Sequence, residues 1–207
     1  MGGATPLKIK DKKMNTVLFV REDSDYKKRG NWDCYDKKRN ALDYNSNDPI
    51  IAHPPCRLWG NLSHLAMRNS KYTIEDKAEE MYLAIFSLEM IEKNGGILEH
   101  PSKSKLFKNH IHNDNNGFLI TIDQYDFGHV AHKETTLYIN GISKDELPPL
   151  PPKDTSIHYC EKGKKRSICG NVKGTTRCTQ KQREYTPSKL IDWFEEVLVL
   201  INNNKRK

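Results

Sequence analysis

The stretch TIEDKAEEMYLAIFSLEMIEKNGGILEHP, residues 73–101, decides the fold. Thr73 followed three residues later by Asp76 has the form of a capping box, which predicts the start of a helix. The helix is expected to end at Asn94-Gly95-Gly96, because glycine favours the backbone conformation that closes helices. Residues 95–100, GGILEH, are then expected to form a strand. Between these limits apolar residues recur at helical spacing, namely Ile74, Ala78, Met81, Tyr82, Ile85, Phe86 and Met90.

Another predicted strand, residues 48–53 (DPIIAH), precedes this helix, so the chain follows the order strand, helix, strand. This order predicts an α/β fold with a Rossmann-like sheet of parallel type, flanked by helices. A last helix is predicted from Thr186 as its N-cap and Pro187 as its first residue. Its apolar stripe consists of Leu190, Ile191, Phe194, Val197, Leu198 and Ile201. The other predicted strands, most of them nearly continuous in apolar character, are residues 16–20, 32–35, 117–122 and 135–140.

The domain organisation follows from length and local composition. A chain of 207 residues fits one domain of ordinary size. Residues 1–15 are polar and rich in lysine, which predicts a flexible basic tail, and residues 16–207 are expected to form a single α/β catalytic domain. Within it, residues 145–184 are interpreted as an insertion that is first proline-rich (ELPPLPP, residues 146–152) and then basic.

Composition excludes several classes of protein. No apolar run approaches the roughly 18 residues that a membrane span needs, so no membrane partner is expected. The first residues, MGGATPLKIKDKK, have no apolar region of the kind found in signal peptides. Five cysteines at uneven spacing, without such a signal, predict a cytoplasmic protein with free thiols rather than structural disulfides.

Most of the net charge of +7 lies between His158 and Glu184, where eight basic residues face two acidic ones and the segment carries +6. Such a segment suggests a polyanionic partner, most plausibly nucleic acid, whereas a solvated loop is the alternative. Lys164, Lys165 and Arg166 are the candidates for phosphate contact. The same segment contains His158, Cys160, Cys169 and Cys178, whose spacing is loose for zinc, so no metal site is assigned.

Polar residues follow three of the predicted strands, at the edge where α/β sheets bind their ligands. One group stands at the end of residues 48–53 and in the loop that follows, a second at the end of residues 95–100, and a third in the turn before residues 135–140. Two prolines stiffen the loop that carries the cysteine of the first group. The candidate site residues in these groups are His53, Pro55, Cys56, Arg57, Glu99, His100, His129 and Lys133.

The loop Pro54-Pro55-Cys56 after a strand, with Glu99 43 residues later and a long helix between them, resembles the cytosine-C5 DNA methyltransferases. The turn 127–135, which begins Phe-Gly-His and brings Lys133 to the position of an arginine, is similar to the next motif of that family. The chain also looks like short phage and prophage proteins with Pro-Pro-Cys, Glu-x-Pro and Phe-Gly-His motifs and a C-terminal Thr-Pro helix. The resemblance covers residues 16–140 and 183–200.

The resemblance implies a sheet of methyltransferase type and a definite chemistry. Cys56 would be the nucleophile that adds to C6 of a pyrimidine, which turns C5 into a nucleophile. Glu99 would hold and protonate N3, and Lys133 would anchor the anion or a phosphate. The base would be flipped out of duplex DNA into the pocket. The remaining strand-end residues would then contact the substrate, namely His53, Pro55, Arg57, His100 and His129.

S-adenosylmethionine is the cofactor that the resemblance implies. Asp36 follows the predicted strand 32–35, where a carboxylate binds ribose hydroxyls, and Asp23 and Ser24 lie in the turn after the first strand. The family has a glycine-rich turn at that point, whereas residues 21–24 are Arg-Glu-Asp-Ser. The sequence therefore departs from the pattern of the family at the cofactor.

The first hypothesis is thus a pyrimidine C5-methyltransferase-like enzyme that acts on DNA and is encoded by a phage. One alternative is an enzyme of the same scaffold that modifies a nucleobase or nucleotide without S-adenosylmethionine. Another is a catalytically inert protein that binds nucleic acid through its basic segment. Structural roles are the alternative for the single residues: Cys56 as a packing residue, Glu99 as a helix cap, and the histidines as hydrogen-bonded core residues.

Overall fold

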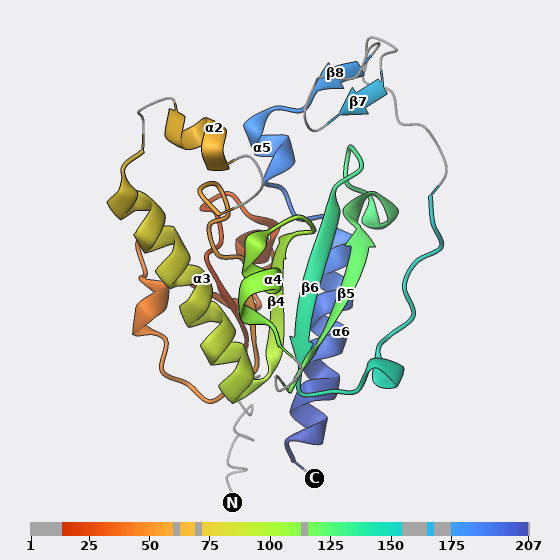
Figure 1. The fold of residues 1–207 in the computed structure, drawn as a ribbon. Helices are drawn as coiled ribbons and strands as arrows, with labels where there is room; N and C mark the ends of the chain where they lie inside the picture. Colours follow the sequence, from red (N-terminus) through yellow and green to blue (C-terminus); the bar gives the residue numbers. More distant parts are fainter. Residues whose placement is uncertain are drawn as a thin grey trace, which may run out of the picture.

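The computed structural model describes residues 14–59, 63–68, 72–112, 116–154, 165–167 and 175–206. Six strands form one sheet in the order β2-β1-β3-β4-β6-β5 (Figure 1). The chain runs from β1 outward to β2 and then returns to the other side of β1 in β3. The order therefore reverses between β1 and β3, and open α/β sheets bind ligands at the carboxyl edge of such a switch point. The strands are β1 (Asn15–Leu18), β2 (Trp32–Cys34), β3 (Ile50–Ala52), β4 (Gly96–Pro101), β5 (Phe118–Asp123) and β6 (Glu134–Asn140).

The sheet is parallel from β2 to β4, as predicted, but the parallel prediction is wrong for β6. β6 lies antiparallel between β4 and β5. Only residues 124–133 connect β5 to β6, and they include the 3-10 turn η2 (Gln124–Phe127), which Gly128 closes in the left-handed region. A parallel return needs a crossover of a dozen residues or more, so this short connection makes a hairpin.

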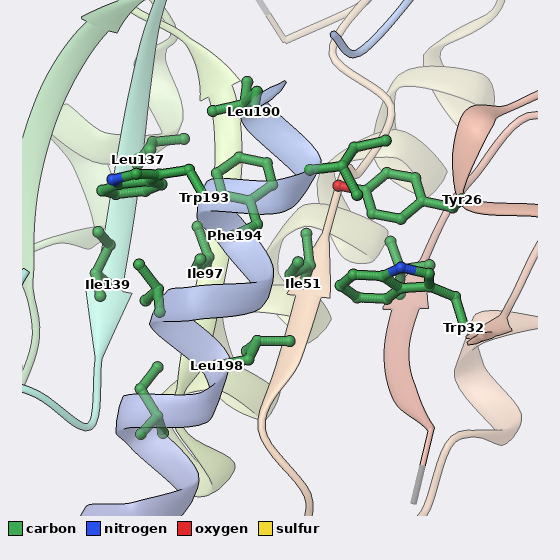
Figure 2. Packing of buried hydrophobic residues seen from close by; sticks show 14 of the residues in the cluster. Tyr26, Trp32, Ile51, Ile97, Leu137, Ile139, Leu190, Trp193, Phe194 and Leu198 are labelled. Carbon is green, nitrogen blue, oxygen red and sulfur yellow. The ribbon is translucent and has the colours of Figure 1, made fainter. Parts of the chain in front are cut away.

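Helices cover both faces of the sheet. α3 (Ile74–Asn94) and α4 (Lys105–His110) lie on one face, and α6 (Ser188–Asn204) lies on the other, together with the short α1 (Asp25–Arg29) (Figure 1). Successive residues of the central strands alternate between the two cores: Ile51 and Ile97 face α6, and their neighbours Ile50 and Leu98 face α3. Figure 2 shows the α6 side, where Phe194 and the other apolar residues of the helix stripe pack on the strands.

The predicted long helix is confirmed, including its start. Thr73 accepts the Asp76 N–H and Asp76 accepts the Thr73 N–H, as a capping box requires. Gly95 follows the helix at φ 72°, and its N–H bonds to the Ile91 carbonyl. Gly96 is needed because a Cβ there would lie 2.0 Å from the Ile50 carbonyl oxygen on β3. These two glycines let the helix end and β4 begin without an intervening loop.

The start of the last helix differs from the prediction by one residue. Pro187 is extended, with ψ 143°, and is the N-cap, so α6 begins at Ser188 rather than at Pro187. The Pro187 carbonyl accepts the N–H groups of Leu190 and Ile191, which is the position of a cap and not of a first helical residue. Thr186 therefore lies before the cap and is free to line the cavity described below.

The remaining elements belong to the predicted tail, the predicted insertion and the connections. Asn15 begins β1, and residues 1–13 of the predicted tail lie outside the described residues. The proline-rich segment lies against α6, where Trp193 donates to the Pro148 carbonyl. None of the helices in the described ranges has the length and apolar character of a membrane span. The other elements are η1 (Ala41–Asp43), α2 (Ser63–Arg68), η3 (Lys144–Glu146), the parallel pair β7 (Lys165–Ser167) and β8 (Thr175–Arg177), and α5 (Gln180–Arg183).

Candidate functional site

A cavity of about 210 Å³ lies at the carboxyl edge of the sheet, at the switch point between β1 and β3. The turn from β1 to α1 forms one wall, and the segment that leads from α5 into α6 forms another. His53, directly after β3, and Glu99, on β4, also line the cavity. Its volume is below the roughly 300–1,000 Å³ of pockets for drug-sized ligands, so it suits a small group such as a single ring.

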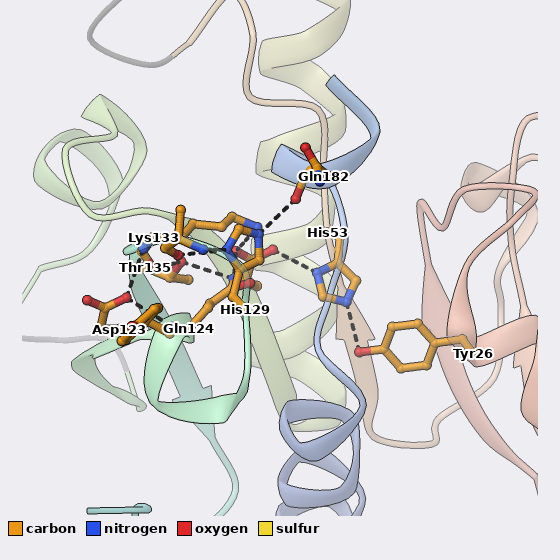
Figure 3. A network of polar contacts seen from close by, with 11 residues as sticks. Tyr26, His53, Asp123, Gln124, His129, Lys133, Thr135 and Gln182 are labelled. Carbon is orange, nitrogen blue, oxygen red and sulfur yellow. Dashed lines mark hydrogen bonds and ion pairs between the residues drawn. The ribbon is translucent and has the colours of Figure 1, made fainter. Parts of the chain in front are cut away.

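Glu99 is the centre of a network of polar contacts (Figure 3). Its Oε2 accepts from His53 Nδ1 at 2.8 Å, and its Oε1 accepts from Gln124 Nε2 at 3.0 Å. Lys133 Nζ lies 3.9 Å from Oε1. Burial acts to raise the pKa of Glu99, but Lys133 and His53 outweigh it and hold the pKa at about 2. Glu99 is therefore an ionised, buried carboxylate with both oxygens engaged.

The hairpin from β5 to β6 brings Gln124 and Lys133 to this carboxylate. Asp123 Oδ1 accepts the backbone N–H groups of Tyr125 and Lys133, at 3.0 and 2.8 Å, and thereby fixes both ends of the turn. Its Oδ2 is 2.6 Å from His132 Nδ1. Gln124 also donates to Thr135 Oγ1 at 3.0 Å, so its amide is held between β4 and β6. The antiparallel return of β6 is thus what brings a cation beside Glu99.

Cys56 lies in a loop that is anchored on both sides. His53 N–H bonds to the Leu18 carbonyl on β1, and Leu58 N–H donates to Glu80 Oε2 on α3 at 2.7 Å. Burial, and after it the charge of Glu99, raise the pKa of the Cys56 thiol to about 11, although Lys133 acts in the opposite direction. The thiol is therefore protonated at neutral pH and needs a base before it can attack.

His53 joins the network to α1. Tyr26 Oη is 3.0 Å from His53 Nε2, so hydrogen bonds run from Tyr26 through His53 to Glu99 (Figure 3). The ring of His53 packs between the rings of Tyr26 and Phe194, with centroids 5.5 and 6.2 Å away. Burial, and then Glu99, raise the pKa of Tyr26 well above its usual value, so its hydroxyl keeps its proton. This proton is available to donate to His53.

Other predicted site residues lie away from the cavity. His100 points to the opposite face of β4 from Glu99, packs edge-on against Phe107, and is 1% exposed. Burial lowers its pKa to about 4, so it is a neutral core residue at neutral pH. Arg57 is exposed and donates to Tyr72 Oη at 2.6 Å. Pro55 stiffens the Cys56 loop but is not among the residues that line the cavity.

His129 is buried and has a structural position. Its Nδ1 contacts the Ala131 carbonyl at 2.7 Å, and its Nε2 contacts the Gln182 carbonyl at 2.8 Å (Figure 3). Burial is the main reason why its pKa is lowered. His129 therefore ties the β5–β6 hairpin to α5 and holds the segment that forms one wall of the cavity.

The residues expected to bind S-adenosylmethionine do not fit that cofactor. Phe19 directly follows β1 at φ 62°, a left-handed conformation that favours glycine, and its side chain packs into the α3 side of the core. Asp36 follows β2 as predicted, but Lys27 pairs with one oxygen, and the backbone N–H groups of Lys38 and Arg39 bond to the other. These contacts, that of Lys27 first, lower the pKa of Asp36 to about 2. The carboxylate is thus engaged within the protein, outside the cavity.

Asp23 and Ser24 do line the cavity, but at its rim and wall. Asp23 pairs with Lys181 at 2.9 Å and with Arg21 at 3.0 Å, and these two contacts lower its pKa to about 2. Arg21 also pairs with Glu184 at 2.5 Å. Ser24 Oγ is buried and has no hydrogen-bond partner among the described residues. The cavity rim is therefore a set of ion pairs between the β1–α1 turn and the segment around α5.

The predicted nucleic-acid contacts are described only in part. Lys164 lies outside the described residues, and Lys165 and Arg166 belong to β7, for which only the backbone is described. His158, Cys160 and Cys169 also lie outside them, so the zinc alternative is not tested. Elsewhere in the described chain, no three His, Cys, Asp or Glu side chains are grouped as a metal site would require.

Two residues of the network were missed from the sequence. Gln124 stands between Asp123 and the Phe-Gly-His turn, and this position beside a predicted strand end was the available signal. Tyr26 gave no signal, because its contact with His53 depends on how α1 packs over β3. No model of a protein family matches this chain, and neither does any curated protein sequence.

Proposed function

We propose that this protein is an enzyme that modifies a pyrimidine base in nucleic acid by addition of the Cys56 sulfur to C6. The observation that carries the proposal is the placement of three groups at the carboxyl edge of the sheet: Cys56 in the loop after β3, Glu99 on the adjacent β4, and Lys133, whose Nζ lies 3.9 Å from Glu99 Oε1. Glu99 and Lys133 are the two charges that act most strongly on the Cys56 thiol. Of these three groups, Glu99 lines the small cavity, whereas Cys56 and Lys133 are not among its lining residues.

The proposed addition accounts for every proton. As the bond from sulfur to C6 forms, the thiol proton passes to Glu99, which is ionised in the free protein and can therefore accept it. The electrons of the C5–C6 double bond shift to the C4–C5 bond, those of the C4–N3 double bond of cytosine shift to N3, and N3 takes the proton from Glu99. Lys133 stabilises the negative charge that develops on the ring. C5 is now nucleophilic, takes up an electrophile such as a proton from solvent, and loses its own proton. N3 then returns its proton to Glu99, the C6–S bond breaks, and the leaving sulfur is protonated again, which restores the aromatic base.

The proposal includes no step through S-adenosylmethionine, because Phe19 and Asp36 do not fit that cofactor. This agrees with the alternative in which a Rossmann-like sheet of methyltransferase type performs a different base modification. Methyl transfer to C5 is the second candidate, and it is favoured by the similarity of the Cys56 loop and of its spacing to Glu99. The basic segment supports DNA as the polymer, and free thiols suit the cytoplasm.

Hydrogen exchange at C5 tests the addition without any cofactor. While the adduct exists, C5 takes a deuteron from D2O and loses its own proton before the thiol leaves. We expect DNA incubated with the protein in D2O to gain one deuterium per target cytosine, as measured by mass spectrometry of the nucleosides. Cys56→Ser should abolish the exchange. Cys34→Ser is the matched control, because burial raises the pKa of that thiol to about 11 as well.

The outcomes separate the candidates. Exchange that survives in Cys56→Ser would refute the proposed function. So would the absence of exchange with DNA, RNA and free nucleotides alike. If the protein binds DNA but no exchange occurs, it is an inert binding protein. If S-adenosylmethionine converts the exchange into a methylated base, the second candidate is correct. Calorimetric titration of the full chain with S-adenosylmethionine measures independently whether the protein binds that cofactor.

A further inference from the structure

The Tyr26 hydroxyl has no part in the proposed addition, yet it stands at the end of the hydrogen bonds that reach Glu99 (Figure 3). Tyr26 is 1% exposed, and its ring packs edge-on against Trp32 with centroids 4.9 Å apart (Figure 2). A buried hydroxyl needs a hydrogen-bond partner, and His53 Nε2 at 3.0 Å is that partner.

The partners assign the proton of His53. Glu99 is ionised and can only accept, so His53 Nδ1 must carry the proton in their 2.8 Å contact. When the imidazole is neutral, the other nitrogen, Nε2, presents a lone pair, and the Tyr26 hydroxyl donates to it. Glu99 on Nδ1 and Tyr26 on Nε2 therefore favour the same tautomer of His53.

We propose that Tyr26 is a positioning residue, which keeps the proton of His53 on Nδ1 and thereby holds the Glu99 carboxylate in one orientation. The contribution to catalysis rests on the proposed function, whereas the tautomer is a property of the free protein. Gln124, itself bound to Thr135, holds the other carboxylate oxygen, so Glu99 is clamped from two sides.

The other tautomer would break this arrangement. With the proton on Nε2, the lone pair of Nδ1 would face Glu99 Oε2 at 2.8 Å, and two acceptors would repel each other. The carboxylate would have to turn, which would disturb the 3.0 Å bond from Gln124. The two aromatic rings that flank His53 also restrict how far its own ring can turn to relieve this repulsion.

NMR spectroscopy of the full chain with ¹⁵N-labelled histidine tests the tautomer directly. We expect His53 in the wild-type protein to show a protonated Nδ1 and an unprotonated Nε2. Tyr26→Phe removes only the donor, so His53 should then exchange between both tautomers. Tyr44→Phe is the matched control, because it removes another buried tyrosine hydroxyl, which donates to the Asp48 carbonyl, and it should leave the His53 signals unchanged.

The C5 exchange assay gives the second reading. Tyr26→Phe should slow exchange about tenfold, and Tyr44→Phe should not. A wild-type His53 with its proton on Nε2 would overturn the proposal, and so would a Tyr26→Phe variant that keeps both the Nδ1–H tautomer and the full exchange rate. If the tautomer is found and is lost in Tyr26→Phe while wild-type protein exchanges no base, the positioning of Glu99 stands and the proposed function fails.

A variant that keeps the hydroxyl guards against failure of Tyr26→Phe to fold. 3-Fluorotyrosine at position 26 has a more acidic hydroxyl and is a stronger donor to His53 Nε2. We expect the Nε2 resonance to move to lower frequency while Nδ1 stays protonated. An unchanged Nε2 resonance in this folded protein would show that Tyr26 does not donate to His53, and would overturn the proposal.

Discussion

Replacement of Lys133 by methionine removes the cation that holds Glu99 in its ionised form while keeping a side chain of similar length. Lys133 Nζ is 3.9 Å from Glu99 Oε1, and two unit charges at that distance attract by about 4 kcal/mol at an effective dielectric constant of ~20. The folded pKa of about 2, against an ordinary 4.5, implies that the charged form contributes about 3 kcal/mol of stability. We therefore expect Lys133→Met to lose about 3 kcal/mol at pH 7, because it leaves a buried carboxylate without its cation.

The pH dependence gives this prediction its sign. The pKa of Glu99 is lowered in the folded protein, so its stabilisation is fully present above pH 4.5 and is lost as the pH falls through about 2. In Lys133→Met the carboxyl group takes up a proton at a higher pH, since burial is no longer outweighed. The difference between variant and wild type should therefore be largest near pH 7 and shrink as the pH approaches 3.

Urea unfolding at pH 7, 5, 4 and 3 measures the difference, with the free energy taken from the midpoint and slope at each pH. Lys108→Met is the control, since Lys108 is an exposed lysine on α4, and we expect it to stay within about 0.5 kcal/mol of wild type. A Lys133→Met protein as stable as this control, or a difference that does not change with pH, would refute the assignment of Lys133 as the partner of Glu99.

Three further predictions concern the fold, the thiol and the basic segment. Gly96→Ala should cost at least about 3 kcal/mol or leave the protein insoluble, because its Cβ would meet the Ile50 carbonyl oxygen at 2.0 Å; thermal melting measures this. Alkylation of Cys56 by iodoacetamide should be slow at pH 7 and accelerate up to about pH 11, as followed by peptide mass spectrometry; fast labelling at pH 7 would contradict the raised pKa. Neutralising three basic residues together should make the dependence of log DNA affinity on log salt shallower by up to about 0.9 per lost phosphate contact. The three residues are Lys164, Lys165 and Arg166. An unchanged slope would indicate that the segment is a solvated loop without phosphate contacts.

Local signals were sufficient where a structure depends on neighbours in sequence. The capping box of Thr73 predicted the start of α3 because both of its hydrogen bonds lie within one turn. The rule that ligand residues follow parallel strands brought His53 and Glu99 together, since β3 and β4 are adjacent and parallel. The same reasoning grouped His100 with Glu99, although successive residues of a strand point to opposite faces, and this alternation could have assigned His100 to the core.

The rest depends on tertiary packing. Nothing in the local sequence around Asp123-Gln124 shows that β6 pairs between β4 and β5. This pairing is what brings Gln124 and Lys133 to Glu99. Tyr26 belongs to a helix of five residues, and only the packing of that helix beside β3 makes its hydroxyl a partner of His53. Asp36 is a different case. The sequence predicts its position after β2, but not that its carboxylate forms an ion pair with Lys27.

The distribution of buried polar groups argues that this network exists for chemistry rather than for stability. A buried ion pair gains little over apolar residues of the same volume, since the desolvation of both charges offsets their attraction. Away from the carboxyl edge, most buried residues of the central strands are apolar, such as Val17, Ile50, Ile51, Ile97 and Leu98, and achieve burial without that cost. At the edge the chain instead buries Glu99 and Gln124 and lines them with His53. These buried polar groups at the edge are consistent with the proposed function, in which Glu99 accepts the proton of the Cys56 thiol.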